Sequence, residues 1–281
     1  MKKTLITTLI ALLFVGCAGL QNEVIHYEEV TKIEQIVIAD FGMLVYEKIK
    51  DSVVIVGSEY SPYGSGYFIE GDYVLTCFHV IENIENIKIQ IKDDEGTYKL
   101  YDMELVGVKQ DKDIAVLKFA NDEDKIVSKP LKFRTKPVMI GMDLYNYGHP
   151  FMTTFYFTKG VVSKVTNSFI MHYDSWVFDY KAVYIDAYMA PGSSGGVSVD
   201  SNGDIVSMTS AGLQDHGIPL GVNISVHVDE LSKHSKAIIA NPELYPMPEP
   251  VVVPPIIIEI EEVEEVEEVE VIEEVEVIEE K

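Results

Sequence analysis

Cysteine and basic residues are scarce in this chain. Only Cys17 and Cys77 occur among its 281 residues, which excludes a framework of disulfides, so a hydrophobic core drawn from its 47% apolar residues must hold the fold. Lys and Arg number 22 against 46 Asp and Glu, which gives a formal net charge of −24. Because nucleic-acid binding needs a basic surface, that function class is excluded as well.

The N-terminus also lacks a hydrophobic run long enough to cross a membrane. The apolar stretch from Thr4 to Gly16 follows two lysines and is shorter than the roughly 20 residues of a spanning helix. We interpret residues 1–16 as a signal peptide and residues 17–49 as a tether and lead-in. Cys17, directly after a small residue, is predicted to carry lipid and to hold the exported chain on a membrane. Phe14 stands where lipidation sites usually have Leu, so an ordinary signal peptide is the alternative.

The chain does contain a serine framed by glycines, within Ala190 to Gly196 (A-P-G-S-S-G-G). A serine nucleophile needs a sharp turn that exposes its hydroxyl, and backbone N–H groups that face the oxygen on which negative charge develops. Gly192 and Gly195 permit the backbone angles of such a turn. We expect Ser194 to attack and the oxyanion hole to be formed at Gly192, Ser193 and Ser194. Ser193 is also the alternative nucleophile.

A histidine and an aspartate precede this serine in one of the known orders of a catalytic triad. His79 lies in the apolar stretch Tyr73 to Ile81, and Asp113 directly precedes another, Ile114 to Leu117. Histidine suits the role of base because its ordinary pKa is about 6.5, and an aspartate fixes the imidazole tautomer. Asp111, two residues before Asp113, is the competing acid.

These residues resemble the motifs of the trypsin-like serine proteases, and most of all those of the bacterial HtrA-type (Deg-type) group. The matching motifs are Gly64-Ser65-Gly66, Leu75-Thr76 with His79-Val80-Ile81, Asp113 to Leu117, Tyr147-Gly148-His149-Pro150, Gly160 to Ser163, and Pro191-Gly192 with Ser194-Gly195-Gly196. The resemblance runs from about Val53 to Leu231. It implies an all-β fold of two six-stranded antiparallel barrels with a short C-terminal helix. His79 and Asp113 would come from the first barrel and Ser194 from the second.

Short apolar runs separated by turn signals agree with that architecture. We expect a protease domain over residues 50–240, with barrels over about 50–125 and 137–227 and a closing helix over Val228 to Ile239. Separate strands are predicted for Tyr98–Tyr101 and Met103–Val108, and again for Phe155–Lys164 and Ser168–Tyr173.

The family's layout also implies a primary substrate pocket. Its expected lining is Tyr188, Met189, Ala190, Thr209, Ser210 and Ala211. None of these is acidic, which favours a small or medium apolar substrate side chain, although His216 or His227 near the pocket would select acidic residues instead. No cofactor and no metal is expected. Cys77 is interpreted as a small buried residue, and the remaining histidines are expected to be structural or on the surface: His26, His149, His172, His216, His227 and His234.

The composition changes after residue 240. Residues 241–255 form a proline-rich linker, and residues 256–281 form a low-complexity tail of Val, Ile and Glu. The tail has thirteen Glu and one Lys, a net of −12 and half of the total charge, which opposes compaction. It is predicted to be a solvated spacer or else a docking segment for a basic partner or a sheet edge. Proteins of the HtrA type commonly carry a PDZ domain here, and this stretch is too short for one.

The sequence therefore predicts a serine endopeptidase that cleaves protein or peptide substrates through an acyl-enzyme intermediate. It would be a lipoprotein of the cell envelope, on the periplasmic face of a membrane or on the cell surface. The alternative is a catalytically inactive lipoprotein of the same fold that binds partners or acts as a scaffold.

Overall fold

A computed structural model describes residues 41–92, 96–121, 129–150, 155–173, 175–215 and 218–249. The signal peptide, the lipidation site Cys17, most of the tether and the acidic tail lie outside the described residues, as do His26 and His216. None of the helices in the described ranges has the length and hydropathy that a membrane crossing requires.

The first barrel is built from six antiparallel strands in the order β1-β2-β3-β6-β5-β4, and pairing of β1 with β4 closes it. Its strands are β1 (Val53–Gly57), β2 (Pro62–Ile69), β3 (Tyr73–Thr76), β4 (Lys88–Lys92), β5 (Tyr98–Lys109) and β6 (Ile114–Phe119). Runs rich in β-branched residues such as Val53 to Val56 are buried throughout, which is why they form interior strands.

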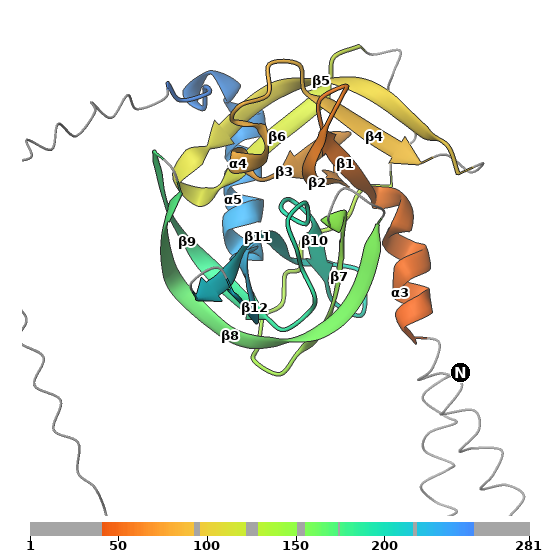
Figure 1. The fold of residues 1–281 in the computed structure, drawn as a ribbon, viewed down its shortest axis with the longest axis vertical. Coiled ribbons are helices and arrows are strands. Elements are labelled where there is room, and N and C mark those ends of the chain that lie inside the picture. Colours follow the sequence, from red (N-terminus) through yellow and green to blue (C-terminus); the bar gives the residue numbers. More distant parts are fainter. Residues whose placement is uncertain are drawn as a thin grey trace, which may run out of the picture.

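The second barrel has the order β10-β11-β12-β9-β8-β7 and is closed by pairing of β10 with β7. Its strands are β7 (Asp143–Gly148), β8 (Tyr156–Tyr173), β9 (Trp176–Ile185), β10 (Val197–Val199), β11 (Ile205–Asp215) and β12 (Ile218–His227). The predicted all-β class with two six-stranded barrels is thereby confirmed (Figure 1).

Short helices connect and flank the barrels. They are α3 (Phe41–Ile49), η1 (Lys50–Ser52), α4 (Phe78–Ile81), η2 (Gln110–Lys112), α5 (Val228–Ala240) and η5 (Pro242–Leu244). The expected closing helix is α5, which contacts strands of both barrels and runs beside them in Figure 1. After η5, the carbonyl of Tyr245 accepts a hydrogen bond from the N–H of Val108 at 2.9 Å, so the chain packs on the first barrel beyond residue 240.

Two strands are longer than the sequence predicts. The separate runs expected on either side of Asp102 are one strand, β5, and those expected on either side of Asn167 are the single strand β8. Irregular pairing lets each strand bend without ending, at Leu105/Gly107 in β5 and at two places in β8. Asp102 and Asn167 look like turn residues in the sequence, which explains the error, although Asp102 pairs in regular register with Lys88 of β4.

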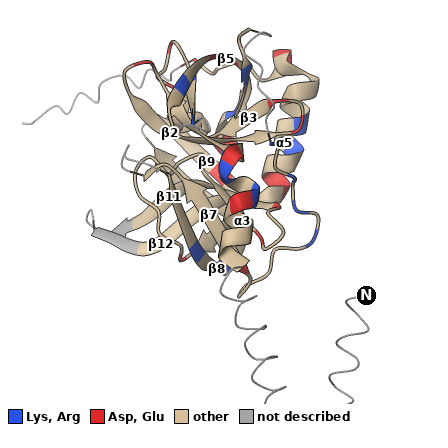
Figure 2. Ribbon diagram, turned by 90° about the vertical axis from the view of Figure 1, so that its right-hand side faces the viewer, with Lys and Arg blue, Asp and Glu red and all other residues tan. Residues whose placement is uncertain are grey.

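One large hydrophobic core extends across both barrels, and the second barrel also holds a smaller cluster around Leu144 and Ile185. The large cluster of buried side chains extends from Val54 of β1 to Val226 of β12, so the two barrels pack against each other. Figure 2 shows acidic and basic residues interspersed along α3 and α5 in that view. The site described next is formed where the barrels meet.

Candidate active site

His79 is placed by the short helix α4, which follows β3 directly. Cys77 has the extended backbone of an N-cap residue, and Phe78, Val80 and Ile81 are buried. His79 is the residue of this turn that retains solvent access, with 12% of its side chain exposed. The ring of Phe78 packs edge-on against Trp176 of β9 at 5.1 Å between centroids, so the second barrel supports the helix that carries His79.

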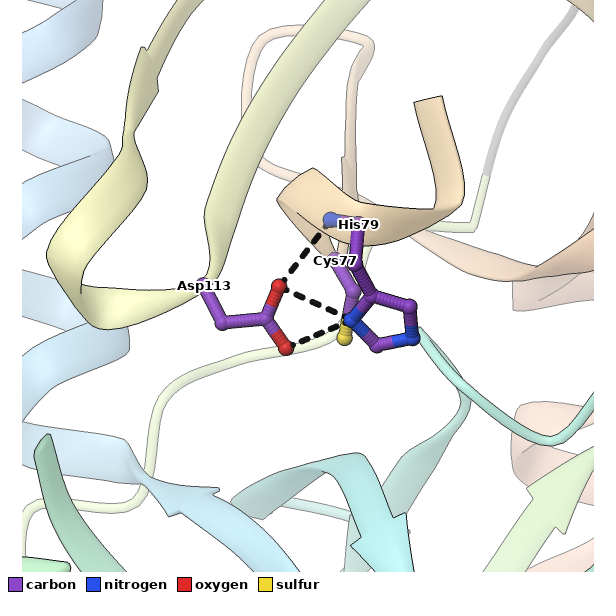
Figure 3. A group of neighbouring side chains, drawn as sticks. All are labelled: Cys77, His79 and Asp113. Carbon is purple, nitrogen blue, oxygen red and sulfur yellow. Dashed lines mark hydrogen bonds and ion pairs between the residues drawn. The ribbon is translucent and has the colours of Figure 1, made fainter. Parts of the chain in front are cut away.

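Asp113 lies directly beside His79. Its Oδ1 and Oδ2 are 3.0 and 2.9 Å from His79 Nδ1, and Oδ1 also accepts from the backbone N–H of His79 at 3.1 Å (Figure 3). The carboxyl group is fully buried at the end of η2, where Asp113 has the left-handed φ of 55°. Asp111 instead is partly exposed and pairs with Lys109 at 2.6 Å. The structure therefore brings Asp113, and not Asp111, to the histidine.

The pKa of His79 is raised above its ordinary value. Burial opposes the charged imidazolium and lowers this pKa, but the charge of Asp113, its hydrogen bond to Nδ1 and the charge of Glu82 outweigh burial. A carboxylate can only accept, so Nδ1 carries the proton that points to Asp113. The other ring nitrogen, Nε2, faces away from Asp113 (Figure 3) and is the one left to act as a base.

Ser194 lies in the second of two consecutive tight turns. In the first, the Ser193 N–H donates to the Ala190 carbonyl at 2.8 Å, and Gly192 has a φ of 94°. In the second, the Gly196 N–H donates to the Ser193 carbonyl at 2.8 Å, and Gly195 has a φ of 82°. A positive φ at the third residue defines a type II turn and demands glycine there. The predicted need for both glycines is thus met in the backbone.

This double turn leaves two N–H groups available. Among the described residues, no backbone hydrogen bond takes up the N–H of Gly192 or of Ser194. Including Ser193 in the oxyanion hole was wrong, because its N–H is used within the first turn. Its side chain is buried as well, and its hydroxyl accepts from the Ala190 N–H at 3.2 Å, which disfavours Ser193 as the nucleophile.

Ser65 of β2 holds the serine loop against the first barrel. Its N–H donates to the Ser194 carbonyl at 2.7 Å, and its hydroxyl donates to the Gly192 carbonyl at 2.9 Å. The same hydroxyl accepts from the His149 N–H at 2.8 Å. One buried serine therefore holds two carbonyls of the serine loop, those of Gly192 and Ser194. The same close approach explains the first glycine of the Gly-Ser-Gly motif, because a Cβ at Gly64 would come within 2.8 Å of the Ser194 carbonyl oxygen.

Ser210 connects Asp113 with Ser194, although the sequence predicted it to line the substrate pocket. Its hydroxyl donates to Asp113 Oδ2 at 2.6 Å, and its carbonyl accepts from Ser194 Oγ at 3.3 Å. In the pairing of β11 with β12, Thr209 and Ala211 face consecutive partners, so Ser210 is the extra residue of a bulge. Within the described residues, Ser194 Oγ makes no hydrogen bond to His79.

The expected substrate pocket needs two further corrections. Tyr188 is exposed, and Met189, Ala190 and Ala211 are half-buried, and these four residues stay a prediction for the pocket lining. The buried Thr209 hydroxyl, however, accepts from the Asn146 amide at 3.0 Å, and the Ser210 hydroxyl faces Asp113, so neither side chain lines the pocket.

Of the two histidines considered for an acidic substrate, His216 lies outside the described residues and His227 is engaged elsewhere. His227 caps α5 by accepting the Asp229 N–H at 3.0 Å, and burial, followed by the charge of Lys181, lowers its pKa to about 4, so it stays neutral. His149 is buried, and His234 pairs with Glu230 of the same helix at 3.1 Å. His172 is exposed.

Cys77, His79 and Asp113 place potential ligand atoms within 4.8 Å of one another, as Figure 3 shows. A thiol binds metal as the thiolate. Burial, and then the charge of Asp113, raise the pKa of Cys77 well above its ordinary value. The thiol therefore keeps its proton, which it donates to the Thr209 carbonyl at 3.1 Å. This chemistry does not fit a metal ligand set, and Cys77 is the buried residue that the sequence indicates.

Comparisons with known proteins agree with the geometry. The chain is 28% identical over 171 residues to Protease Do-like 1, chloroplastic, of Arabidopsis thaliana, which covers 60% of this chain and 38% of the relative. It is 28% identical over 167 residues to the periplasmic serine endoprotease DegP of Escherichia coli strain K12, covering 58% of this chain and 33% of that protein. The aligned part thus spans little more than a third of these relatives.

Solved structures show the same fold. The HtrA-type protease AlgW with decapeptide superposes with a TM-score of 0.58 at 20% identity, covering 70% of this chain and 66% of that one. The Rv3671c protease in its inactive form has a TM-score of 0.56 at 21% identity, over 69% of this chain and 92% of that one. The model of the trypsin-like peptidase domain matches residues 64–208, which is more than half of the chain. The chain therefore belongs to the trypsin-like peptidase family, and its relatives there are serine proteases of the HtrA/DegP type.

Proposed function

We propose that this chain is a serine endopeptidase that hydrolyses protein substrates with His79 as base, Asp113 as its partner and Ser194 as nucleophile. The observation that carries the proposal is the contact of His79 Nδ1 with the buried Asp113, next to a double turn that presents Ser194. The N–H groups of Gly192 and Ser194 supply the oxyanion hole. The family's relatives named as serine endoproteases add support.

The chemistry follows from these groups. Ser194 Oγ attacks the substrate carbonyl carbon while His79 Nε2 takes the hydroxyl proton, and the two N–H groups stabilise the resulting oxyanion. Asp113 stabilises the imidazolium, which then protonates the leaving amine as the C–N bond breaks. Water repeats the sequence on the acyl-enzyme and regenerates Ser194. The cycle requires the Ser194 hydroxyl to rotate from the Ser210 carbonyl to His79, an adjustment that substrate commonly induces.

Covalent labelling of the purified protein by a fluorophosphonate probe tests this proposal. We expect wild type to be labelled, and Ser194→Ala to lose both the label and about 10⁴- to 10⁶-fold of its peptide hydrolysis. Ser193→Ala is the matched control, because it removes the adjacent hydroxyl and should keep the label. Undiminished hydrolysis by Ser194→Ala would refute the assignment.

A second function remains a candidate because the Ser194 hydroxyl is directed to the Ser210 carbonyl and not to His79. In that case the chain would be an inactive protein of the same fold that binds partners or acts as a scaffold. A folded wild-type protein that neither reacts with the probe nor cleaves peptides, but still binds a partner, would establish this function.

We further propose that the protein is exported and attached to an envelope membrane through lipid on Cys17. Export agrees with relatives that are named as periplasmic. Labelled palmitate should be incorporated into wild type and into Cys77→Ser, but not into Cys17→Ser. Soluble, unlabelled wild-type protein would favour an ordinary signal peptide. A basic partner for residues 256–281 is part of the same proposal, and its binding should weaken as salt rises.

A further inference from the structure

A chain of three buried groups runs from the second barrel to the proposed catalytic acid. The Tyr180 hydroxyl of β9 is 2.8 Å from Ser210 Oγ, and Ser210 Oγ is 2.6 Å from Asp113 Oδ2. Tyr180 and Asp113 are fully buried, and Ser210 is 5% exposed. Ser210 has one proton and the carboxylate can only accept, so Ser210 donates to Asp113 and must accept from Tyr180. The direction of the chain is therefore fixed.

The same strand also holds the backbone that carries Asp113. Gln110 Nε2 donates to the Val177 carbonyl at 3.3 Å, and Lys112 Nζ donates to the Asp179 carbonyl. Asp113 follows this turn with a φ of 55°, a conformation that costs a residue other than glycine roughly 1–2 kcal/mol. Contacts from β9 thus help to hold Asp113 in a backbone conformation that few residues other than glycine, Asn and Asp adopt.

We propose that Tyr180 is a positioning residue for Asp113 and acts on it through the Ser210 hydroxyl. This inference rests on the proposed peptidase function, because it assigns Tyr180 a part in orienting the acid of that reaction. No contact between Tyr180 and substrate is involved. Burial, and then the charge of Asp113, raise the pKa of Tyr180 well above its ordinary value, so the phenol remains a hydrogen-bond donor at every working pH.

Loss of the Tyr180 hydroxyl should raise the pKa of His79. Donation by the Tyr180 hydroxyl polarises the Ser210 hydroxyl and strengthens its hydrogen bond to Asp113, so Tyr180 helps Ser210 to stabilise negative charge on Asp113. When this bond weakens, Asp113 retains more charge for the imidazolium, and the pKa of His79 rises. The other titratable groups near this series of hydrogen bonds are Cys77, Glu82 beside His79, and Tyr184 of β9.

Tyr180→Phe tests the proposal because it removes one hydroxyl and little volume. The matched control is Tyr67→Phe, since Tyr67 is also fully buried and its hydroxyl has no hydrogen-bond partner among the described residues. We expect Tyr180→Phe to lower kcat/KM about 2- to 10-fold, the effect of one hydrogen bond, and to move the acid limb of the pH profile to higher pH. Tyr67→Phe should keep both the wild-type rate and the wild-type limb.

A double-mutant cycle separates this role from simple packing. If Tyr180 acts through Ser210, then Tyr180→Phe has no further effect on rate or acid limb in a Ser210→Ala background. An effect of equal size in both backgrounds, or an unchanged limb in Tyr180→Phe, would overturn the inference. Should Tyr180→Phe not fold, 3-fluorotyrosine at residue 180 is the second variant. Its stronger donor should move the limb to lower pH, and an unmoved limb would count against the inference.

Labelling with the fluorophosphonate probe distinguishes a failure of the positioning role from a failure of the proposed peptidase function. Wild-type protein that reacts with fluorophosphonate and shows no response to Tyr180→Phe would refute the positioning role alone. Wild-type protein that does not react would refute the peptidase proposal on which the role rests.

Discussion

The turn at Ser194 gives the sharpest quantitative prediction, through the substitution Gly195→Ala. Gly195 has a φ of 82°, and a Cβ there would lie 2.0 Å from the Ser65 carbonyl oxygen and 2.6 Å from Thr76 Oγ1. Gly141 has the same φ of 82°, but a Cβ there meets nothing within 4 Å. The two glycines therefore separate the cost of the backbone angle from the cost of the contact.

The expected magnitudes differ accordingly. Gly141→Ala should lower the free energy of unfolding by about 1–2 kcal/mol, the cost of a left-handed residue with a side chain. Gly195→Ala carries the same cost and also forces the serine loop and Ser65 apart by about 1 Å before the contact becomes tolerable. Displacement of a reacting group by about 1 Å costs about 100-fold in rate. We expect Gly195→Ala to lose at least that much hydrolysis, and more stability than Gly141→Ala.

Urea unfolding followed by tryptophan fluorescence measures the stabilities, and peptide hydrolysis at equal concentrations of folded protein measures the rates. Gly141→Ala should keep wild-type hydrolysis, because its turn is remote from the serine loop in the chain and makes no contact with the new methyl group. Equal losses of stability in the two variants, together with normal hydrolysis by Gly195→Ala, would refute the argument that Ser65 leaves room only for glycine.

Three further predictions follow from the same structure. Asp113→Asn should lower kcat about 10⁴-fold, because the amide would favour the wrong tautomer of the His79 imidazole. Asp111→Asn should keep wild-type hydrolysis, and the reverse result would make Asp111 the acid. Because the pKa of His79 is raised, hydrolysis should fall as pH drops through a value above about 6.5, and a profile that stays flat down to pH 5 would contradict this. Truncation after Glu249 should keep the melting temperature and hydrolysis, since it removes only the end of the linker and the acidic tail. Truncation before Tyr245 removes a contact to β5 and should lower the melting temperature; equal melting temperatures would show that this contact adds no stability.

The sequence by itself determined the class of fold and the position of the serine turn. Both signals are local: short β-branched runs between turn residues indicate barrel strands, and a left-handed φ at Gly192 and Gly195 requires the absence of a side chain. The order of His79, Asp113 and Ser194 then carried the family resemblance. The continuity of β5 and β8 was not predictable, because Asp102 and Asn167 look like turn residues in the sequence but lie within strands whose pairing with their neighbours continues on both sides.

Tertiary structure alone decided how the proposed site is assembled. The motif before Ile114 already favoured Asp113 over Asp111, and the tertiary structure supplies the physical reason. Burial and a left-handed backbone direct the Asp113 carboxylate to His79, whereas Asp111 pairs with Lys109 in solvent. Ser210 reaches Asp113 across 97 residues of sequence, because a bulge in β11 places it outside the regular pairing. Sequence periodicity describes the faces of single strands, whereas these contacts depend on the register between strands and on the packing of one barrel against the other, which no local pattern encodes.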